Sequence, residues 1–276
     1  MNSTVKRGIF GVLFLAVMLG GLLFYEWLFV ILFAFITGGM LYEFYKMTMG
    51  DCFQASQKEA VFAGIILFLL GNQYFFGGHK SWTIGLGILL VLAIMVRTIL
   101  EKNHTDFQKT GFLYAGLLYI GLPLALSNAV VCKDGEFSGL LMVAFFCIIW
   151  ASDVGAYCFG MLIGQKIWPA KMCPEISPKK SWAGFIGGWI TVLLTAWILN
   201  KTGLSDFPLV HILMMASLMH VMGVLGDLFE SLWKRSAGIK DSGNIIPGHG
   251  GLLDRFDSSL FAIPTGYIYL LLVGIV

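Results

Sequence analysis

The chain has 276 residues, of which 58% are hydrophobic and 12% are charged, and its formal net charge is +2. A soluble globular domain carries about 25% charged residues, so this composition excludes an ordinary soluble domain and indicates a polytopic membrane protein. The five cysteines are scattered and form no CxxC pair, which argues against a disulfide framework.

Long apolar stretches follow one another along the whole chain. A membrane-spanning helix needs about 20 apolar residues, so we expect an all-α membrane protein with about nine transmembrane helices. The first stretch follows Lys6 and Arg7, and no small-residue cleavage site ends it, so we expect a retained span and not a signal peptide. The expected spans are 8–25, 27–46, 60–77, 81–99, 111–131, 138–164, 182–200, 208–229 and 258–276.

The basic residues predict the orientation. With a cytoplasmic N-terminus and alternating spans, fifteen of the 18 Lys and Arg residues fall on the cytoplasmic side. This arrangement places the two charged loops, 165–181 and 230–257, in the cytoplasm. We expect residues 1–137 to form a scaffold of helices, because their spans hold few interior charges. We expect residues 138–276 to carry a catalytic site that faces the cytoplasm.

The first polar feature of the second half is Asp153, inside the span 138–164. A lone acid in a span costs at least about 2.5 kcal/mol on insertion, so we expect it to face the protein interior or a polar cavity. It could bind a ligand there, or it could make an interhelical hydrogen bond.

The second feature is the segment that leads into the span 182–200. Pro178 disfavours helix at Ser177, and Ser181 could cap a helix that begins at Trp182. Two lysines, Lys179 and Lys180, stand with these hydroxyl groups at a helix N-terminus, which is a plausible seat for a phosphate. Alternatively, these lysines only fix the orientation of the chain.

The third feature is the charged stretch 227–258, which lies between two apolar segments. Its first four polar residues are spaced i, i+3, i+4 and i+7 and therefore share one helical face. Its last three repeat the i, i+3, i+4 spacing at the start of the final span. The two sets are Asp227, Glu230, Ser231 and Lys234, and Asp254, Asp257 and Ser258. Opposed carboxylates without cysteine or clustered histidine favour a hard cation, with Mg²⁺ ahead of zinc.

Cations and glycines lie between these two carboxylate sets. The glycines would let backbone N–H groups approach a phosphate closely. A metal ion bound by carboxylates, with basic side chains and accessible backbone N–H groups around it, is typical of enzymes that transfer phosphoryl or nucleotidyl groups. His249 could act as a base or simply as a hydrogen-bonding group. The alternative is a pair of ion-paired helix ends joined by a flexible loop. The residues in question are Lys234, Arg235, Lys240 and Pro247 to Gly251.

These residues resemble the signature of the phosphatidate cytidylyltransferases, also called CDP-diacylglycerol synthases. The resemblance covers roughly residues 150–260. This chain departs from the family pattern at Trp233, where an aliphatic residue or Phe is usual, and at Ser181, where Thr is common. The matching motifs are Ser231-x-x-Lys234-Arg235, Lys240-Asp241, Pro247-x-His249-Gly250-Gly251-x-x-Asp254-Arg255-x-Asp257, Asp153-Val154-Gly155-Ala156-Tyr157, Ser177-Pro178-Lys179-Lys180-Ser181 and Gly184-x-x-Gly187-Gly188.

The resemblance implies an enzyme that converts phosphatidic acid and CTP into CDP-diacylglycerol and pyrophosphate. It implies that Asp227 and Asp254 hold Mg²⁺, with K⁺ as a candidate second cation, at a site that faces the cytoplasm and opens to the membrane. We expect Asp153 and Ser177–Lys180 to fold back and complete this site. The expected catalytic residues are Asp227, Asp254, Lys234, Arg235, Lys240, Asp241, His249, Arg255 and Asp257, and the expected substrate-binding residues are Asp153, Ser177, Lys179, Lys180, Ser231, Gly250 and Gly251.

The family also suggests a homodimer, and we expect no nucleic-acid partner. The short N-terminus favours a bacterial inner membrane as the location. Two other function classes stay open on the residues alone. Asp153 and Asp227 could form an ion or proton path in a transporter, although the charges gather at one membrane face and no inverted repeat is visible. A lipid or polyprenol kinase that uses CTP or ATP would share the membrane setting and the metal chemistry.

Overall fold

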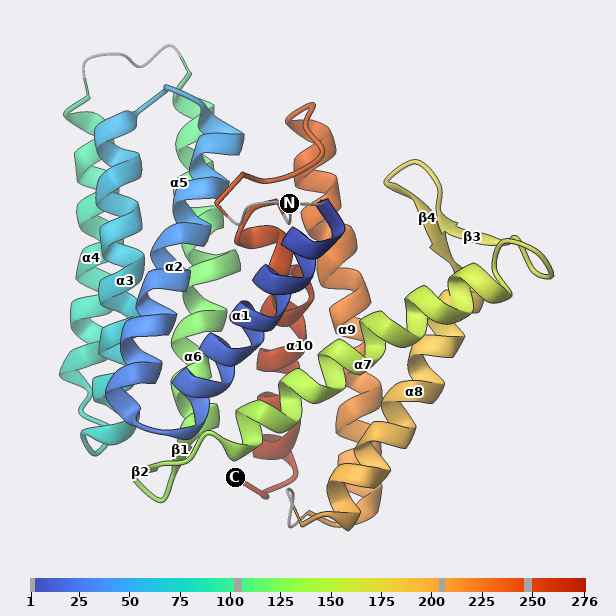
Figure 1. Cartoon of the computed structure of the whole chain (residues 1–276). Helices are drawn as coiled ribbons and strands as arrows, with labels where there is room; N and C mark the ends of the chain where they lie inside the picture. The colour runs from blue at the N-terminus through green and yellow to red at the C-terminus, as the bar shows by residue number, and fades with distance from the viewer. Residues whose placement is uncertain (1–2, 102–105, 204–206, 246–249) are drawn as a thin grey trace. The chain divides into compact units, whose positions relative to one another are not determined.

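A computed structural model describes residues 3–101, 106–203, 207–245 and 250–276, and it is 76% helical (Figure 1). Each predicted span coincides with a helical segment, which confirms the all-α fold. Two short antiparallel strand pairs join neighbouring helices. The elements are α1 Ser3–Leu23, α2 Glu26–Met49, α3 Gln54–Phe76, α4 Trp82–Ile99, the 3-10 helix η1 Phe107–Thr110, α5 Gly111–Gly116, the π-helix η2 Leu117–Gly121, α6 Leu122–Val131, β1 Cys132–Lys133, β2 Glu136–Phe137, α7 Leu140–Leu162, β3 Lys171–Cys173, β4 Ser177–Ser181, α8 Trp182–Lys201, α9 Leu209–Ser236 and α10 Leu253–Leu272.

Seven helical segments in the described part of the chain are long and apolar enough to cross a membrane. They are α2, α3, α4, the continuous segment Phe107–Val131, α7, α8 and α9. The apolar part of α1 is shorter, Phe10–Leu23, and α10 is not among the seven. The number of nine spans therefore stays a prediction. Helix is the expected state in a bilayer, because a helix satisfies all of its backbone polar groups internally.

The chain divides into two compact units. The first unit consists of residues 1–139 and 237–256, and the second consists of residues 140–236 and 257–276. The chain passes into the second unit within α10. The segment 237–256, which carries much of the predicted signature, therefore packs with the N-terminal helices.

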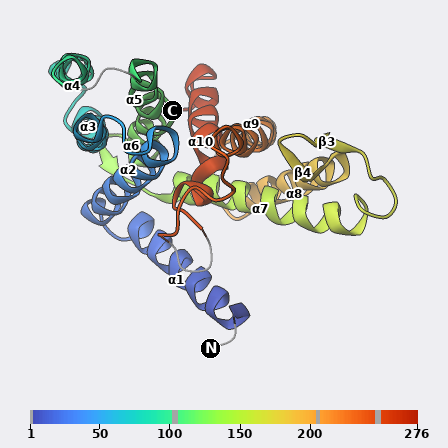
Figure 2. The same cartoon turned by 90° about the horizontal axis from the view of Figure 1, so that it is seen from above.

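In the first unit, α3 packs between α2 and α4, and Phe107–Val131 packs against α2 and α3. Figure 2 shows α3 and α4 nearly end-on. The core is aromatic, with Phe29, Phe33 and Phe68 in contact and fully buried. Tyr45 donates a hydrogen bond to the carbonyl oxygen of Leu113 over 2.8 Å, which ties α2 to α5.

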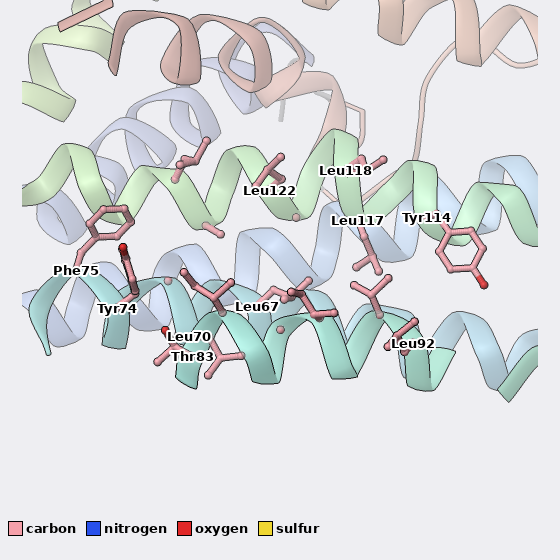
Figure 3. Close-up of a pocket in the computed structure, with 18 residues that line it drawn as sticks. Leu67, Leu70, Tyr74, Phe75, Thr83, Leu92, Tyr114, Leu117, Leu118 and Leu122 are labelled. Atoms are coloured by element: carbon pink, nitrogen blue, oxygen red, sulfur yellow. The ribbon is translucent and has the colours of Figure 1, made fainter. Parts of the chain in front are cut away.

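The first unit also contains an apolar cavity of about 650 Å³ between α3, α4 and the segment Phe107–Val131 (Figure 3). Leucine is the commonest residue in its lining, and Tyr74 and Thr83 lie toward one end and Tyr114 toward the other. No charged residue and no predicted site residue is among those that line it. Its lining therefore suits an apolar group better than a charged nucleotide.

In the second unit, α7 and α8 pack closely along small residues. A Cβ added at Gly184 would lie 2.8 Å from the carbonyl oxygen of Ala156, so only glycine fits this contact. Small residues let helix backbones approach in membranes. His220 of α9 bonds to both neighbours, through Nδ1 to the Ser152 hydroxyl (2.7 Å) and through Nε2 to the Phe185 carbonyl oxygen (3.0 Å).

Candidate active site

The segment that leads into α8 folds as the sequence predicted. Ser181 has an extended backbone, and its hydroxyl accepts a hydrogen bond from the Gly184 N–H over 3.1 Å. The cap is confirmed, and α8 begins at Trp182. The preceding residues, Ser177–Ser181, form β4, which pairs with β3 in a hairpin beside the ends of α7 and α8 (Figure 1).

Lys180, near the end of this hairpin, reaches α9. Its Nζ lies 2.8 Å from Oδ2 of Asp227, and it also donates to the carbonyl oxygen of Val224 over 3.2 Å. The two side chains are 21% and 33% exposed, so water screens this ion pair only in part. Further along the two elements, Arg235 Nε donates to the carbonyl oxygen of Ile176 over 3.4 Å. The hairpin segment Ser177–Ser181 and the signature face of α9 are thus in direct contact.

The polar face predicted for residues 227–234 is present on α9. Ser231 Oγ lies 3.4 Å from Oδ1 of Asp227, and Lys234 forms an ion pair with Glu230. The Glu230 side chain is fully buried, and Ser231 and Lys234 are also buried. This face therefore points into the protein.

The helix itself is longer than predicted. The predicted span ended at residue 229 and the predicted helical face at Lys234, and α9 continues to Ser236. The i, i+4 ion pair of Glu230 with Lys234 and the basic residues of the last turn stabilise this extension. Two residues after the end of the helix, Gly238 has a φ of +71°, a left-handed conformation that suits glycine.

Carboxylates gather in the second unit. Asp257 is half-buried, and the carboxylates of Asp227, Glu230 and Asp153 are close enough to interact with it electrostatically. The neighbouring ammonium groups are those of Lys180 and Lys234. A bound cation would reduce the repulsion among these carboxylates. Asp153 was expected to face the protein interior or a polar cavity, and in the structure it is exposed on α7.

The first unit holds Asp254, in the first turn of α10. Oδ2 of Asp254 accepts hydrogen bonds from the backbone N–H groups of Gly251 (2.8 Å) and Ser242 (3.0 Å). A Cβ at Gly250, whose φ is +87°, would lie 2.8 Å from the same oxygen. The glycines expected to offer N–H groups to a phosphate therefore also serve Asp254, and the Gly251 N–H points to it.

Glu43 of α2 was assigned to the scaffold, and the structure places it against this same loop. It is 3% exposed, and it accepts hydrogen bonds from the hydroxyl of Ser242 and from the backbone N–H groups of Leu252 and Leu253. The sequence did contain a signal for this residue. An acid inside a predicted span is costly, and the reasoning that selected Asp153 applies to Glu43 as well.

The other predicted site residues lie at the surface or lie outside the described residues. Lys179, Arg235, Lys240, Asp241 and Arg255 are exposed, and Ser177 is partly exposed. The cations among them, Lys179, Arg235, Lys240 and Arg255, are accessible to a phosphate from solvent. Pro247, Gly248 and His249 lie outside the residues that the structure describes, so the role of His249 stays a prediction.

The donor chemistry fits a magnesium ion better than a softer metal. Asp227 and Asp254 offer only oxygen, which Mg²⁺ prefers. Among the described residues, no three His, Cys, Asp or Glu side chains form a metal-binding group. Mg²⁺ in nucleotide enzymes is commonly held by one or two carboxylates together with substrate phosphates.

Comparison with known proteins adds independent evidence. A model of the cytidylyltransferase family matches residues 5–273. A phosphatidate cytidylyltransferase of Bacillus subtilis is 38% identical over 208 residues, which cover 75% of this chain and 75% of that protein. One from Staphylococcus saprophyticus is 34% identical over 214 residues, 75% of this chain and 76% of that protein. One from Haemophilus influenzae is 42% identical over 139 residues, 48% of this chain and 47% of that protein.

Proposed function

The chain belongs to the cytidylyltransferase family, and we propose that it is a membrane enzyme that transfers the cytidylyl group of CTP to phosphatidic acid. The products are CDP-diacylglycerol and pyrophosphate, and the reaction serves phospholipid synthesis. The observation that carries this proposal is the family match over residues 5–273, which includes the whole charged stretch 227–258.

The reaction is an in-line displacement at phosphorus. A phosphate oxygen of phosphatidic acid attacks the α-phosphorus of CTP, the bond between that phosphorus and the oxygen bridging to the β-phosphorus breaks, and pyrophosphate leaves. The second pKa of a phosphomonoester is about 6, so the attacking group is already largely ionised near neutral pH. A strong general base is therefore not required, and His249 need not act as one.

Positioning and charge neutralisation supply the catalysis. We assign Mg²⁺ to Asp227 and Asp254, and K⁺ stays a candidate second cation. Bound Mg²⁺ would offset the negative charge of the nucleotide phosphates. Among the chain's own residues, Lys234, Arg235, Lys240 and Arg255 are assigned to the phosphates.

The remaining site residues are assigned to binding and orientation. Ser177, Lys179 and Lys180 would seat the nucleotide or the lipid phosphate. Asp153 would orient a polar group near Asp257. Supporting this assignment, Lys180 already holds a carboxylate oxygen of Asp227 at 2.8 Å, so an anion that arrives there meets an ordered ammonium group.

We place the site at the cytoplasmic face of a bacterial cytoplasmic membrane. Helix α9 has 28 residues and is about 42 Å long, whereas the hydrocarbon core is about 30 Å thick. Its charged last turns can therefore extend from the hydrocarbon into water. The distribution of Lys and Arg favours the cytoplasm for that end. A homodimer remains a prediction from the resemblance.

The deciding experiment uses purified protein in phospholipid–detergent micelles with CTP labelled at the α-phosphate. We expect labelled CDP-diacylglycerol and an equal amount of pyrophosphate, formed only with phosphatidic acid and a divalent metal, and with Mg²⁺ better than zinc. Formation of CDP without pyrophosphate would identify a kinase. Solute flux in proteoliposomes without CTP, together with no lipid product, would identify a transporter. No observation in the described residues or the comparisons favours either alternative.

A further inference from the structure

Glu43 is a buried carboxylate that the reaction described above does not use. Its Oε1 accepts a hydrogen bond from the Leu252 N–H over 3.0 Å. Its Oε2 accepts one from the Leu253 N–H over 2.8 Å and one from the Ser242 hydroxyl over 3.2 Å. Both carboxylate oxygens are therefore engaged, and all three donors belong to the signature stretch.

The chain packs closely around this carboxylate. A Cβ at Gly243 or Gly251 would collide with its oxygen atoms, and a Cβ at Gly39, one turn earlier on α2, would lie 2.8 Å from Leu252. Leu252 and Leu253 are themselves buried. A buried carboxylate is costly unless donors satisfy it, and the N–H groups at a helix start need acceptors. The N–H groups at the start of α10 therefore satisfy the Glu43 carboxylate, and the carboxylate gives these N–H groups an acceptor.

Ser242 connects Glu43 to the proposed chemistry. Its hydroxyl binds Glu43, and its backbone N–H binds Oδ2 of Asp254. Asp254 also follows Leu253 directly. The hydrogen bonds that Leu252 and Leu253 donate to Glu43 therefore fix the turn that carries Asp254. Glu43 of α2 thus bonds to both ends of the segment Ser242–Leu253, and Asp254 of α10 bonds to its first residue.

We propose that Glu43 is a positioning residue for the cytidylyl transfer, acting through Ser242 and the first turn of α10 to hold the Asp254 carboxylate. The inference rests on the proposed function, because it assumes that Asp254 takes part in the reaction. This role for Glu43 would mean that the N-terminal helices help to position a catalytic residue and are more than a scaffold.

The test is Glu43→Gln in the full-length purified protein. Glutamine has the same shape, but both oxygens of Glu43 accept hydrogen bonds. The NH₂ group of glutamine must therefore face a group that is itself a donor. We expect kcat to fall about 10- to 100-fold, the magnitude typical of a residue that orients a ligand group, while the KM for phosphatidic acid is unchanged. Glu43→Asp keeps the charge on a shorter side chain and should recover part of the lost kcat.

Glu101→Gln is the matched control. Glu101 also belongs to the first unit, and it also accepts a backbone N–H (Ser56, 3.1 Å) and a hydroxyl (Ser56 Oγ, 3.0 Å) near a helix start. We expect Glu101→Gln to lower the unfolding temperature and to leave kcat unchanged. An equal loss of kcat in both variants, or wild-type kcat in Glu43→Gln, would overturn the inference.

Hydrogen exchange supplies a readout that does not depend on activity. In Glu43→Gln the amides of Leu252 and Leu253 should exchange faster than in the wild type, and in Glu101→Gln they should not. Unchanged protection of these amides would also overturn the inference. If the wild-type protein made no CDP-diacylglycerol, the proposed function would fail, and the exchange result would still test the contact. Should Glu43→Gln fold poorly, Ser242→Ala removes one of the three donors and should give a smaller loss of kcat.

Discussion

Lys180 and Asp227 form an ion pair, with 2.8 Å between Nζ and Oδ2, which joins the β3–β4 hairpin to α9. These residues come from two separate parts of the predicted signature, and the structure brings them together. The pair is partly buried, so each charge depends on the other more than in an exposed ion pair. An anionic substrate near Lys180 would compete with Asp227 for the ammonium group, while a cation would compete with Lys180 for Asp227.

The first prediction concerns Lys180→Met. This substitution roughly keeps the length of the side chain and removes its charge, so the ion pair with Asp227 is lost. We expect kcat/KM for CTP or phosphatidic acid to fall about 10- to 100-fold. The substrate whose KM rises identifies the phosphate that Lys180 binds. Lys171→Met, on the other strand of the same hairpin, is the control and should retain wild-type activity. Full activity in Lys180→Met would remove Lys180 from the site.

The second prediction compares Asp227→Asn with Asp254→Asn. Both variants should lose CDP-diacylglycerol formation while still inserting into the membrane, because each loses a carboxylate assigned to the metal. They should differ in stability. Asparagine at 254 can still accept from the N–H groups of Ser242 and Gly251 through Oδ1, but these bonds lose the help of the negative charge, so Asp254→Asn should cost about 1 kcal/mol of stability. Thermal unfolding in detergent measures this difference. Near-normal activity in either purified variant would refute the metal assignment.

The third prediction concerns Gly251→Ala. The added Cβ would lie 2.7 Å from the backbone nitrogen of Gly243 and would also collide with Ser242 and Glu43. We expect a destabilisation of about 1–3 kcal/mol, typical of overpacking, together with loss of most activity. Gly85→Ala on α4 is the matched control, because a Cβ there meets nothing within 4 Å. If Gly251→Ala were as stable and active as Gly85→Ala, the close packing around the Glu43 carboxylate would be wrong.

The fourth prediction concerns Ser152→Ala in the second unit. The Ser152 hydroxyl bonds to Nδ1 of His220 over 2.7 Å, while Nε2 faces the Phe185 carbonyl oxygen. The carbonyl can only accept, so Nε2 carries the proton and Nδ1 accepts from Ser152. Removing this hydroxyl should lower the free energy of unfolding by about 0.6 kcal/mol, the average for interhelical hydrogen bonds in membranes, and by no more than about 1.7 kcal/mol. Activity should be retained. Loss of activity without loss of stability would mean that Ser152 or His220 serves the reaction.

The sequence predicted the features that depend on neighbouring residues. Hydropathy placed the helices, because a helix must bury about 20 apolar residues to cross a bilayer. The Ser181 cap and the shared face of Asp227, Glu230, Ser231 and Lys234 also followed from local spacing, and the structure contains both. Hydropathy alone ended the span at residue 229, before the ion-paired turn of Glu230 and Lys234 that extends α9 to Ser236.

Only the tertiary structure revealed the contacts between distant residues. Nothing in the spacing links Glu43 to Ser242, Leu252 and Leu253, because that contact depends on how α2 packs against the start of α10. The pairing of Lys180 with Asp227 likewise depends on the hairpin folding against α9. The sequence alone therefore determined the helices, their polar faces and the residue types of the site. The packing of those helices decided which carboxylates meet which donors, because such contacts join residues that are far apart in the chain.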